Sequence, residues 1–498
     1  MFVKAPVGGG IPAALLIVGL VGVSCATRPE VEATTAPTST LTVTSTTGAA
    51  PTTQSEPVDP PGAGDPLAPS AGNPGYDVSR YDWRLSVNES TGALSGIATL
   101  NATAVEPASS VWLDYTGPAP ERIQVDGRDA RFSYTGPKIE IETDVDAGDK
   151  FTIEAILDGT PEALPTGDGW VHDEGLVYAM AVLPGDTASW IPLNDTPTDP
   201  AVFSVTVGTA PGVVALASGT PTVSDGVWTW ETPVAVSEIG LAVGRFESRV
   251  VPSVSEPRIT LSTPEGQIPP SEAAIDNVVG EMLTHLESYL GPFPFPTVGL
   301  TMIPGFPGAN STPGQIFLGV VDRHTIYHEL SHQWIAGSVG TASSTDVWLR
   351  EGITEYLAFL WISTQDGELP LESEMRSMYD LMAPSTRAPR DMQTRADRSD
   401  WAVYMRGPLT IHALRQAMGD DSFPGRTDRL DCGVRGSLLD DRGLHCRDAV
   451  SHRHRRRGPS HPVDRRGDAP PVPRNVNHPH QQDVASEQRA ATHFEKED

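Results

Sequence analysis

Two histidines separated by three residues form the pattern in this chain with the clearest chemical potential. Residues 328–332 read His-Glu-Leu-Ser-His. On a helix, residues i and i+4 lie on one face, so the imidazoles of His328 and His332 can reach one metal ion. Glu329 lies beside them, where its carboxylate can take a proton from a water bound to that ion. Neutral imidazoles with a carboxylate suit Zn²⁺, which keeps a fourth position open for water.

A third metal ligand is predicted on the helix that follows. Residues 348–352 read Trp-Leu-Arg-Glu-Gly, and Glu351 is separated from His332 by residues 333–350. Apolar residues continue at helical spacing beyond this segment, so the glutamate is expected near the start of an amphipathic helix. We predict one zinc ion per chain, bound by His328, His332 and Glu351. The alternative interpretation is a helix with a solvated polar stripe.

The elements that must position this site change character along the chain. Between residues 76 and 255, apolar residues such as Trp83, Leu85 and Val87 alternate with polar ones, and Gly, Pro and Asp clusters separate the runs. This pattern predicts a mostly antiparallel β-sandwich. Between residues 256 and 423 the apolar spacing becomes helical, with helices expected at 271–290, around the two motifs, and at 404–418. The predicted fold is therefore a multidomain α+β chain, with the active site between the two domains.

The motifs resemble the zinc signature of the aminopeptidase N-like gluzincins. The resemblance covers roughly residues 76–423. It is carried by His-Glu-Leu-Ser-His-Gln-Trp at 328–334, Trp-Leu-Arg-Glu-Gly at 348–352, Trp-Ile-Pro-Leu-Asn-Asp-Thr-Pro at 190–197 and Val-Tyr-Met-Arg-Gly at 403–407. It implies that the helical domain is a thermolysin-like catalytic domain.

The resemblance also implies residue roles. His328, His332 and Glu351 bind zinc, Glu329 is general base and acid, and Tyr404 stabilises the oxyanion. A phenol aimed at a tetrahedral intermediate is a useful hydrogen-bond donor, which agrees with this role. The alternative for Tyr404 is a core tyrosine on an amphipathic helix.

Two positions depart from the family pattern. The family recognises a free α-amine with a glutamate in a loop before the zinc helix and with a second polar residue in the sandwich. Here residues 308–314 read Gly-Ala-Asn-Ser-Thr-Pro-Gly, so Ser311 takes the place of the glutamate, and Leu183 takes the second place. We therefore expect zinc-dependent peptide hydrolysis with altered exopeptidase specificity. The alternative function is a surface binding lipoprotein that keeps the zinc fold without turnover.

Three polar residues near the motifs have less defined roles. Glu355 lies one turn after Glu351, so it either hydrogen-bonds a zinc ligand or faces solvent. His324 precedes the zinc helix and is expected in a loop or on the surface. His412 lies on the expected helix at 404–418 and is expected to be a packing residue.

The N-terminus predicts export. Residues 1–24 combine Lys4, an apolar core and small residues before Cys25, which resembles a bacterial lipobox. An ordinary cleaved signal peptide is the alternative, and the apolar run is too short to span a membrane. Residues 25–75 are rich in Thr and Pro and predict a flexible tether. We therefore expect a lipoprotein held at the outer face of the cell membrane through Cys25, or a secreted protein.

The overall composition excludes some classes of binding partner and of catalytic site. A formal net charge of −29 argues against nucleic acid, so the expected partner is a peptide or protein substrate. Residues 26–431 contain no cysteine, which excludes a thiolate metal site, a cysteine nucleophile or a disulfide there. Residues 424–498 lack apolar periodicity and hold seven of the 13 histidines. This segment is either a disordered basic tail or the product of translation out of frame.

Overall fold

The computed structural model describes the part of the chain between the N-terminal segment and the tail. The described residues are 62–224, 227–252, 257–268, 275–276, 278–365, 367–385, 387–420, 423, 437–440 and 443–447. The predicted signal peptide, Cys25 and most of the predicted tail lie outside these residues. Within them, no helix combines the length and the apolar character needed to cross a membrane.

The N-terminal part is built from β-sheets. Its largest sheet has eight strands in the order β13-β14-β11-β1-β2-β8-β4-β5. These strands are β1 (Tyr76–Asn88), β2 (Ala93–Ala104), β4 (Arg122–Val125), β5 (Arg128–Asp129), β8 (Lys150–Gly159), β11 (Val202–Gly208), β13 (Thr220–Ser224) and β14 (Val227–Glu231). β1 pairs antiparallel with β2 but parallel with β11, so the sheet is mixed rather than wholly antiparallel.

Two smaller sheets complete this part. One has the order β12-β15-β10-β9 and the other β3-β7-β6. Their strands are β3 (Ala108–Asp114), β6 (Phe132–Tyr134), β7 (Lys138–Val145), β9 (Gly169–Asp173), β10 (Leu176–Met180), β12 (Val214–Ala217) and β15 (Leu241–Gly244). The alternating residues Trp83, Leu85 and Val87 all point into the core, where the Trp83 ring meets Trp190 edge-on at 5.4 Å. The short turn η2 (Thr187–Ser189) leads directly to Trp190.

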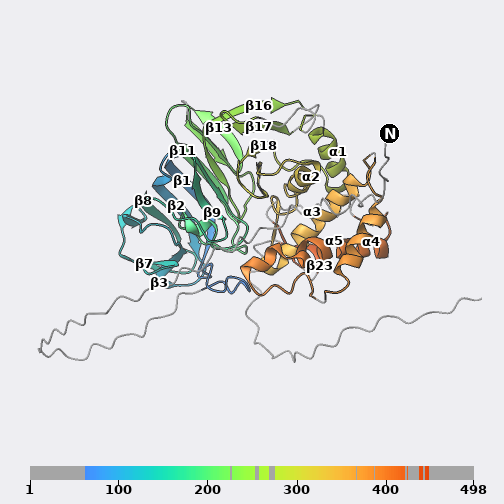
Figure 1. The fold of residues 1–498 in the computed structure, drawn as a ribbon. Helices are drawn as coiled ribbons and strands as arrows, with labels where there is room; N and C mark the ends of the chain where they lie inside the picture. Colours follow the sequence, from blue (N-terminus) through green and yellow to red (C-terminus); the bar gives the residue numbers. More distant parts are fainter. Residues whose placement is uncertain are drawn as a thin grey trace, which may run out of the picture. The chain divides into compact units, whose positions relative to one another are not determined.

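The C-terminal part contains the predicted helices together with a small sheet (Figure 1). The sheet has the order β16-β17-β18-β20-β19. Its strands are β16 (Phe246–Val251), β17 (Arg258–Pro264), β18 (Thr297–Met302), β19 (Ala309–Thr312) and β20 (Gln315–Leu318). Because β16 pairs with β17, this sheet begins before the predicted boundary at residue 255. The result is a β-rich region followed by a region of helices around a small sheet.

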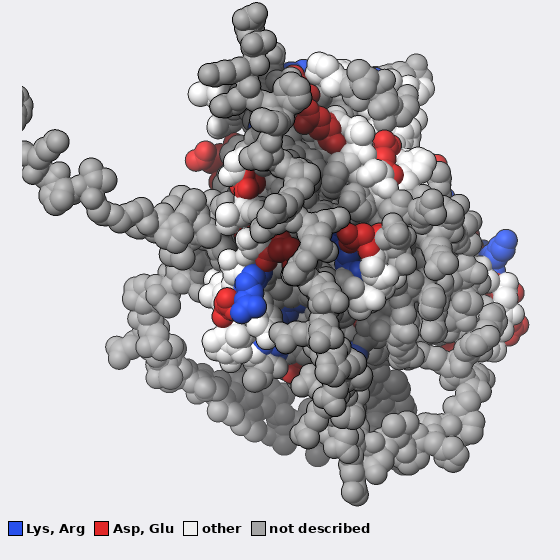
Figure 2. All heavy atoms as spheres, turned by 90° about the vertical axis from the view of Figure 1, so that its right-hand side faces the viewer, with Lys and Arg blue, Asp and Glu red and all other residues white. Residues whose placement is uncertain are grey.

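The described residues form five α-helices. They are α1 (Val279–Leu290), α2 (Arg323–Ser331), α3 (Val347–Ile362), α4 (Leu371–Met382) and α5 (Gly407–Met418), with short turns η3 (Ser344–Asp346), η4 (Arg395–Ser399) and η5 (Ala402–Arg406). Of these helices, α1, α2, α3 and α5 lie where helices were predicted, and α4 was not predicted. α1 ends at Gly291, whose φ of +80° suits glycine and stops the helix. On the face drawn in Figure 2, acidic side chains lie at several separate places, in keeping with the acidic sequence.

The predicted tether differs from the structure at its C-terminal end. Residues 62–75 are packed, because their polar groups find buried partners. The Asp65 carboxylate accepts hydrogen bonds from the backbone N–H and the hydroxyl of Ser344. The backbone N–H of Asn73 donates to Asn194 Oδ1 at 2.7 Å. The tether prediction is therefore wrong for residues 62–75, and its earlier residues lie outside the described range.

Two strands lie within the predicted tail. β22 (Ser437–Asp440) pairs parallel with β21 (Val339–Thr341), and β23 (Gly443–Arg447) pairs antiparallel with β22. The alternative of a disordered tail therefore does not hold for these two strands, and residues 424–436, 441–442 and 448–498 lie outside the described residues.

Candidate metal centre

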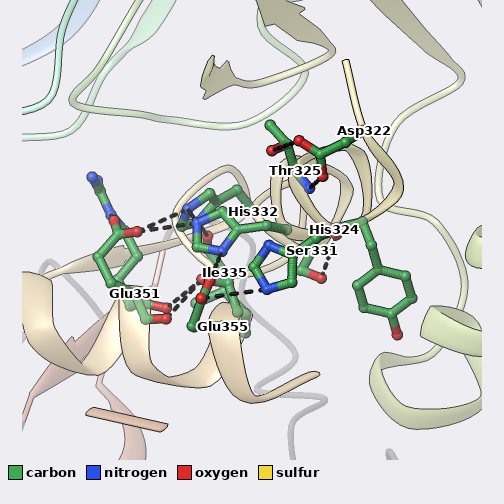
Figure 3. Close-up of polar contacts among 12 residues, drawn as sticks. Asp322, His324, Thr325, Ser331, His332, Ile335, Glu351 and Glu355 are labelled. Atoms are coloured by element: carbon green, nitrogen blue, oxygen red, sulfur yellow. Dashed lines mark hydrogen bonds and ion pairs between the residues drawn. The ribbon is translucent and has the colours of Figure 1, made fainter. Parts of the chain in front are cut away.

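Helix α2 presents the two motif histidines. The side chain of Asp322 caps its first turn by accepting a hydrogen bond from the backbone N–H of Thr325 at 2.9 Å (Figure 3). His328 lies in the last turn, and the backbone N–H of His332 still bonds to the carbonyl of His328. Helical geometry therefore continues through the motif. It places both imidazoles on one buried face, as the spacing predicted.

Helix α3 brings Glu351 to the same point. Its Oε2 atom lies 3.2 Å from His328 Nε2 and 3.3 Å from His332 Nε2. The two Nε2 atoms lie 3.0 Å apart. His328, His332 and Glu351 can each offer one ligand atom within 4.8 Å of the others, and all three are buried. The predicted ligands are thus brought together, although residues 333–350 separate the last two in sequence.

The remaining ring nitrogens show that these imidazoles fit a zinc ion. His328 Nδ1 bonds to Glu355 Oε2 at 2.8 Å, and His332 Nδ1 bonds to the carbonyl of Ile335 at 3.1 Å. Donating through Nδ1 leaves each Nε2 lone pair free to bind a metal. Two imidazole nitrogens and a carboxylate oxygen then converge, which is the donor set that zinc takes in catalytic sites.

Glu355 belongs to the metal centre. It is buried, and besides His328 it faces His324, whose Nε2 lies 3.4 Å from Glu355 Oε1. Of the two interpretations of Glu355, the structure therefore favours the hydrogen-bond partner of a ligand. His324 lies in the first turn of α2 and is half-buried, so the loop position predicted for it is wrong, and it is not one of the three clustered ligands. His412 packs against the ring of Tyr356, as expected.

One carboxylate oxygen of Glu329 accepts no hydrogen bond from the described residues. Glu329 is 6% exposed, and among the described residues its Oε2 atom has no hydrogen-bond partner. Burial raises the pKa of Glu329, while the nearby imidazoles of His332 and His328 oppose that shift. A buried carboxylate oxygen without a donor is uncommon in folded proteins, and it is the arrangement that a proton acceptor requires.

Tyr404 lies close to the predicted zinc ligand His328. It comes from the π-helical turn η5, which runs into α5, and its ring lies 6.4 Å from the His328 ring. π-helical turns occur often at functional sites. Burial raises the pKa of Tyr404 well above its usual range, and Glu351 adds to this shift. The phenol therefore stays protonated and able to donate.

Two glycines set the approach of α3 to α5. Gly352 follows Glu351, and Gly407 follows η5. A Cβ atom at Gly352 would lie 2.9 Å from the Gly407 Cα atom, and a Cβ at Gly407 would meet Gly352 Cα at the same distance. A side chain at either position would have to push the helices apart.

Sequence reasoning missed two residues beside the ligands. Arg350 is 6% exposed and donates from Nε to Glu351 Oε1 at 2.8 Å. Its Nη1 atom donates to both oxygens of Glu238, at 2.9 and 3.1 Å. Burial opposes ionisation of Glu351, but His332 and Arg350 hold its pKa well below the usual range. Glu238 is 112 residues from Arg350 in sequence, so no local pattern signals this pair.

A pocket lies where the β-rich and helical parts meet. It has about 340 Å³ of empty volume, and its lining includes Leu183 and Glu238 from the β-rich part and Ser344 and Val347 from the helical part. Leu183 is buried against apolar side chains. Ser311 accepts a hydrogen bond from Gln333 Nε2 at 2.6 Å. Neither of these two positions therefore presents a charge to a substrate.

Comparisons with known proteins agree with this geometry. Residues 321–427 match the peptidase family M1 domain. The fold matches the crystal structure of an M1 zinc metallopeptidase from Deinococcus radiodurans, with 29% identity, a TM-score of 0.69, and coverage of 77% of this chain and 92% of that one. The chain therefore carries a peptidase family M1 domain at residues 321–427. This match and the M1 zinc metallopeptidases among the similar structures confirm the predicted resemblance to the aminopeptidase N-like gluzincins and the zinc cofactor.

The curated relatives that the chain matches are longer proteins. Aminopeptidase M1-A of rice is 25% identical over 278 residues, which cover 48% of this chain and 31% of that protein. Human endoplasmic reticulum aminopeptidase 1 is 23% identical over 270 residues, covering 47% of this chain and 28% of that protein. The chain thus spans about a third of the length of these two relatives.

Proposed function

We propose that this chain hydrolyses peptide bonds at a zinc ion held by His328, His332 and Glu351. The observation that carries the proposal is the convergence of these three ligand atoms beside the unpartnered carboxylate oxygen of Glu329. A zinc ion at this position supplies Lewis acidity, which activates water and polarises a carbonyl near neutral pH.

The protein's own residues then perform the proton transfers. Glu329 Oε2 is free to accept the proton of the attacking water and to pass it to the leaving amine. The protonated phenol of Tyr404 is a donor for the oxygen on which charge develops. Glu355 holds the His328 ring in the tautomer that binds metal through Nε2.

The substrate class is proposed from the two neutral positions. A mutant of the Deinococcus radiodurans enzyme has been crystallised with a Tyr-Ser-Ala substrate, so a related site holds a short peptide. In this chain Ser311 and Leu183 offer no carboxylate for an ammonium group. Glu355 does not replace them, because it is bound to His328 and His324. We therefore propose a short peptide substrate, with a weaker preference for a free N-terminus than an ionised carboxylate would give.

We also propose where the protein works. The lipobox-like segment ending at Cys25 supports an exported protein anchored by a lipid, or a secreted one. Incorporation of labelled fatty acid into the full chain, and its loss in Cys25→Ser, would support the anchored form. Equal labelling of both proteins would contradict it.

The function is tested by Glu329→Gln in the zinc-loaded protein. The variant keeps the ligands but lacks the proton acceptor, so we expect full zinc content and a loss of peptide hydrolysis of about 10²–10⁴-fold or more. Glu281→Gln, an exposed change on α1, is the control and should match the wild type. Hydrolysis by Glu329→Gln at the rate of the control would refute the proposal. So would a zinc-loaded wild type that cleaves neither free nor N-blocked peptides.

A further inference from the structure

Arg350 connects a metal ligand to the β-rich part of the molecule. Its guanidinium lies between Glu351 on its own helix and Glu238, which lies between β14 and β15. The arginine side chain is 7% exposed, the Glu351 side chain 4% and the Glu238 side chain 24%. Burying a charge is costly unless it is paired, so this arrangement needs both carboxylates in place.

The two carboxylate oxygens of Glu351 have different partners. Oε1 accepts from Arg350 Nε at 2.8 Å, whereas Oε2 faces the Nε2 atoms of His328 and His332. A carboxylate can otherwise rotate and present either oxygen, or both, to a metal ion. With Oε1 held by a charged donor, only Oε2 is directed to the position between the imidazoles.

Glu238 fixes the other end of the guanidinium. Both of its oxygens accept from Arg350 Nη1, at 2.9 and 3.1 Å. The arginine is therefore held at two edges, and its Nε cannot turn away from Glu351 without breaking the contact with Glu238. A planar guanidinium suits this function, since its donors have a fixed relative geometry.

We propose that Arg350 is a positioning residue that directs Glu351 Oε2 to the metal, and that Glu238 sets zinc affinity through Arg350. The β-rich part thereby contributes to the metal centre without supplying a ligand. This inference concerns metal binding alone. Its failure would leave the proposed hydrolysis untouched, because the test uses no substrate.

The experiment is a double-mutant cycle on zinc affinity. Zinc dissociation constants are measured by competition with a chromophoric chelator for the wild type, Glu238→Gln, Arg350→Gln and the double variant. We expect each single change to weaken zinc binding by about 10–100-fold, the range known for hydrogen-bond partners of ligands. The double variant should bind zinc no more weakly than Arg350→Gln, because Glu238 acts only through the arginine.

The control breaks a comparable ion pair away from the ligands. Arg395 in η4 bonds to Asp186 in the β-rich part at 2.5 Å, so Arg395→Gln removes the charged partner of a buried carboxylate. The Arg395→Gln variant should change zinc affinity by less than two- to threefold. Without metal, its melting temperature should fall by about as much as that of Glu238→Gln. If Arg350→Gln does not fold, the comparison of Glu238→Gln with Arg395→Gln decides. Equal zinc affinities in those two variants, or additive losses in the double variant, would overturn the proposal.

Discussion

The contact between Glu355 and His328 allows a quantitative prediction. Glu355 Oε2 accepts a hydrogen bond from His328 Nδ1 at 2.8 Å, and the pair is buried. Glu355→Gln keeps the size of the side chain and one oxygen acceptor but removes the charge. The imidazole then loses a charge-assisted hydrogen bond that makes its Nε2 a better donor to metal.

The magnitude follows from this geometry. Losing such a partner lowers metal affinity by about 10–100-fold, or roughly 1.4–2.8 kcal/mol at about 1.4 kcal/mol per tenfold. Glu355→Gln retains an acceptor and should fall near the tenfold end. Glu355→Ala leaves His328 Nδ1 without its buried acceptor, so it should fall near the hundredfold end.

Chelator competition at a fixed pH near 7.5 measures both affinities. Glu281→Gln, an exposed glutamate on α1, provides the control for removing one negative charge from a helix. Zinc affinities of Glu355→Gln and Glu355→Ala within twofold of this control would refute the reasoning. A larger loss of zinc affinity in Glu355→Gln than in Glu355→Ala would also refute the reasoning, since the acceptor that Gln retains would then contribute nothing.

Four further changes test other residues. His332→Ala should remove most of the bound zinc, and full occupancy by metal analysis would exclude it as a ligand. Tyr404→Phe should keep zinc and lower kcat by about 10²-fold or more with little change in KM, whereas an unchanged kcat would exclude the donor role. Ser311→Glu should raise turnover of an aminoacyl amide but not of its N-acetylated form, and an equal gain on both would contradict the substrate proposal. Burial raises the pKa of Asp195 from 3.8 to about 7, so this group destabilises the fold increasingly as pH rises from about 4 to about 7. The free energy of unfolding, measured with urea at pH 5 and at pH 8, should therefore fall less with pH in Asp195→Asn than in the wild type. An equal fall in both proteins would show that the pKa shift is absent.

The metal cluster was predictable because its pattern is local. The spacing of His328 and His332 places both on one helical face, and the helix carrying Glu351 follows directly. Helices α1, α2, α3 and α5 were predicted for the same reason, since their apolar residues repeat at helical spacing, whereas α4 was not predicted.

Other features depend on contacts between distant residues. Arg350 and Glu238 are 112 residues apart, and Asp65 and Ser344 are 279 apart. The composition of residues 62–75 is that of a linker, yet hydrogen bonds to buried partners order them. The parallel pairing of β1 with β11 could not be inferred either, because alternation indicates which residues face the core and not which strand lies next to which.

Because of the close approach of Gly352 and Gly407, zinc binding and the placement of Tyr404 depend on different contacts, so one can be lost without the other. The metal ligands are fixed by α2, α3 and the contacts of Arg350 and Glu355, none of which involves α5. Tyr404 depends instead on the distance between two backbones, and that distance has no room for even one methyl group. A population of natural or engineered variants should therefore include proteins that bind zinc normally but turn over poorly. In such proteins the defect would lie in helix spacing, at positions with no chemical group to lose.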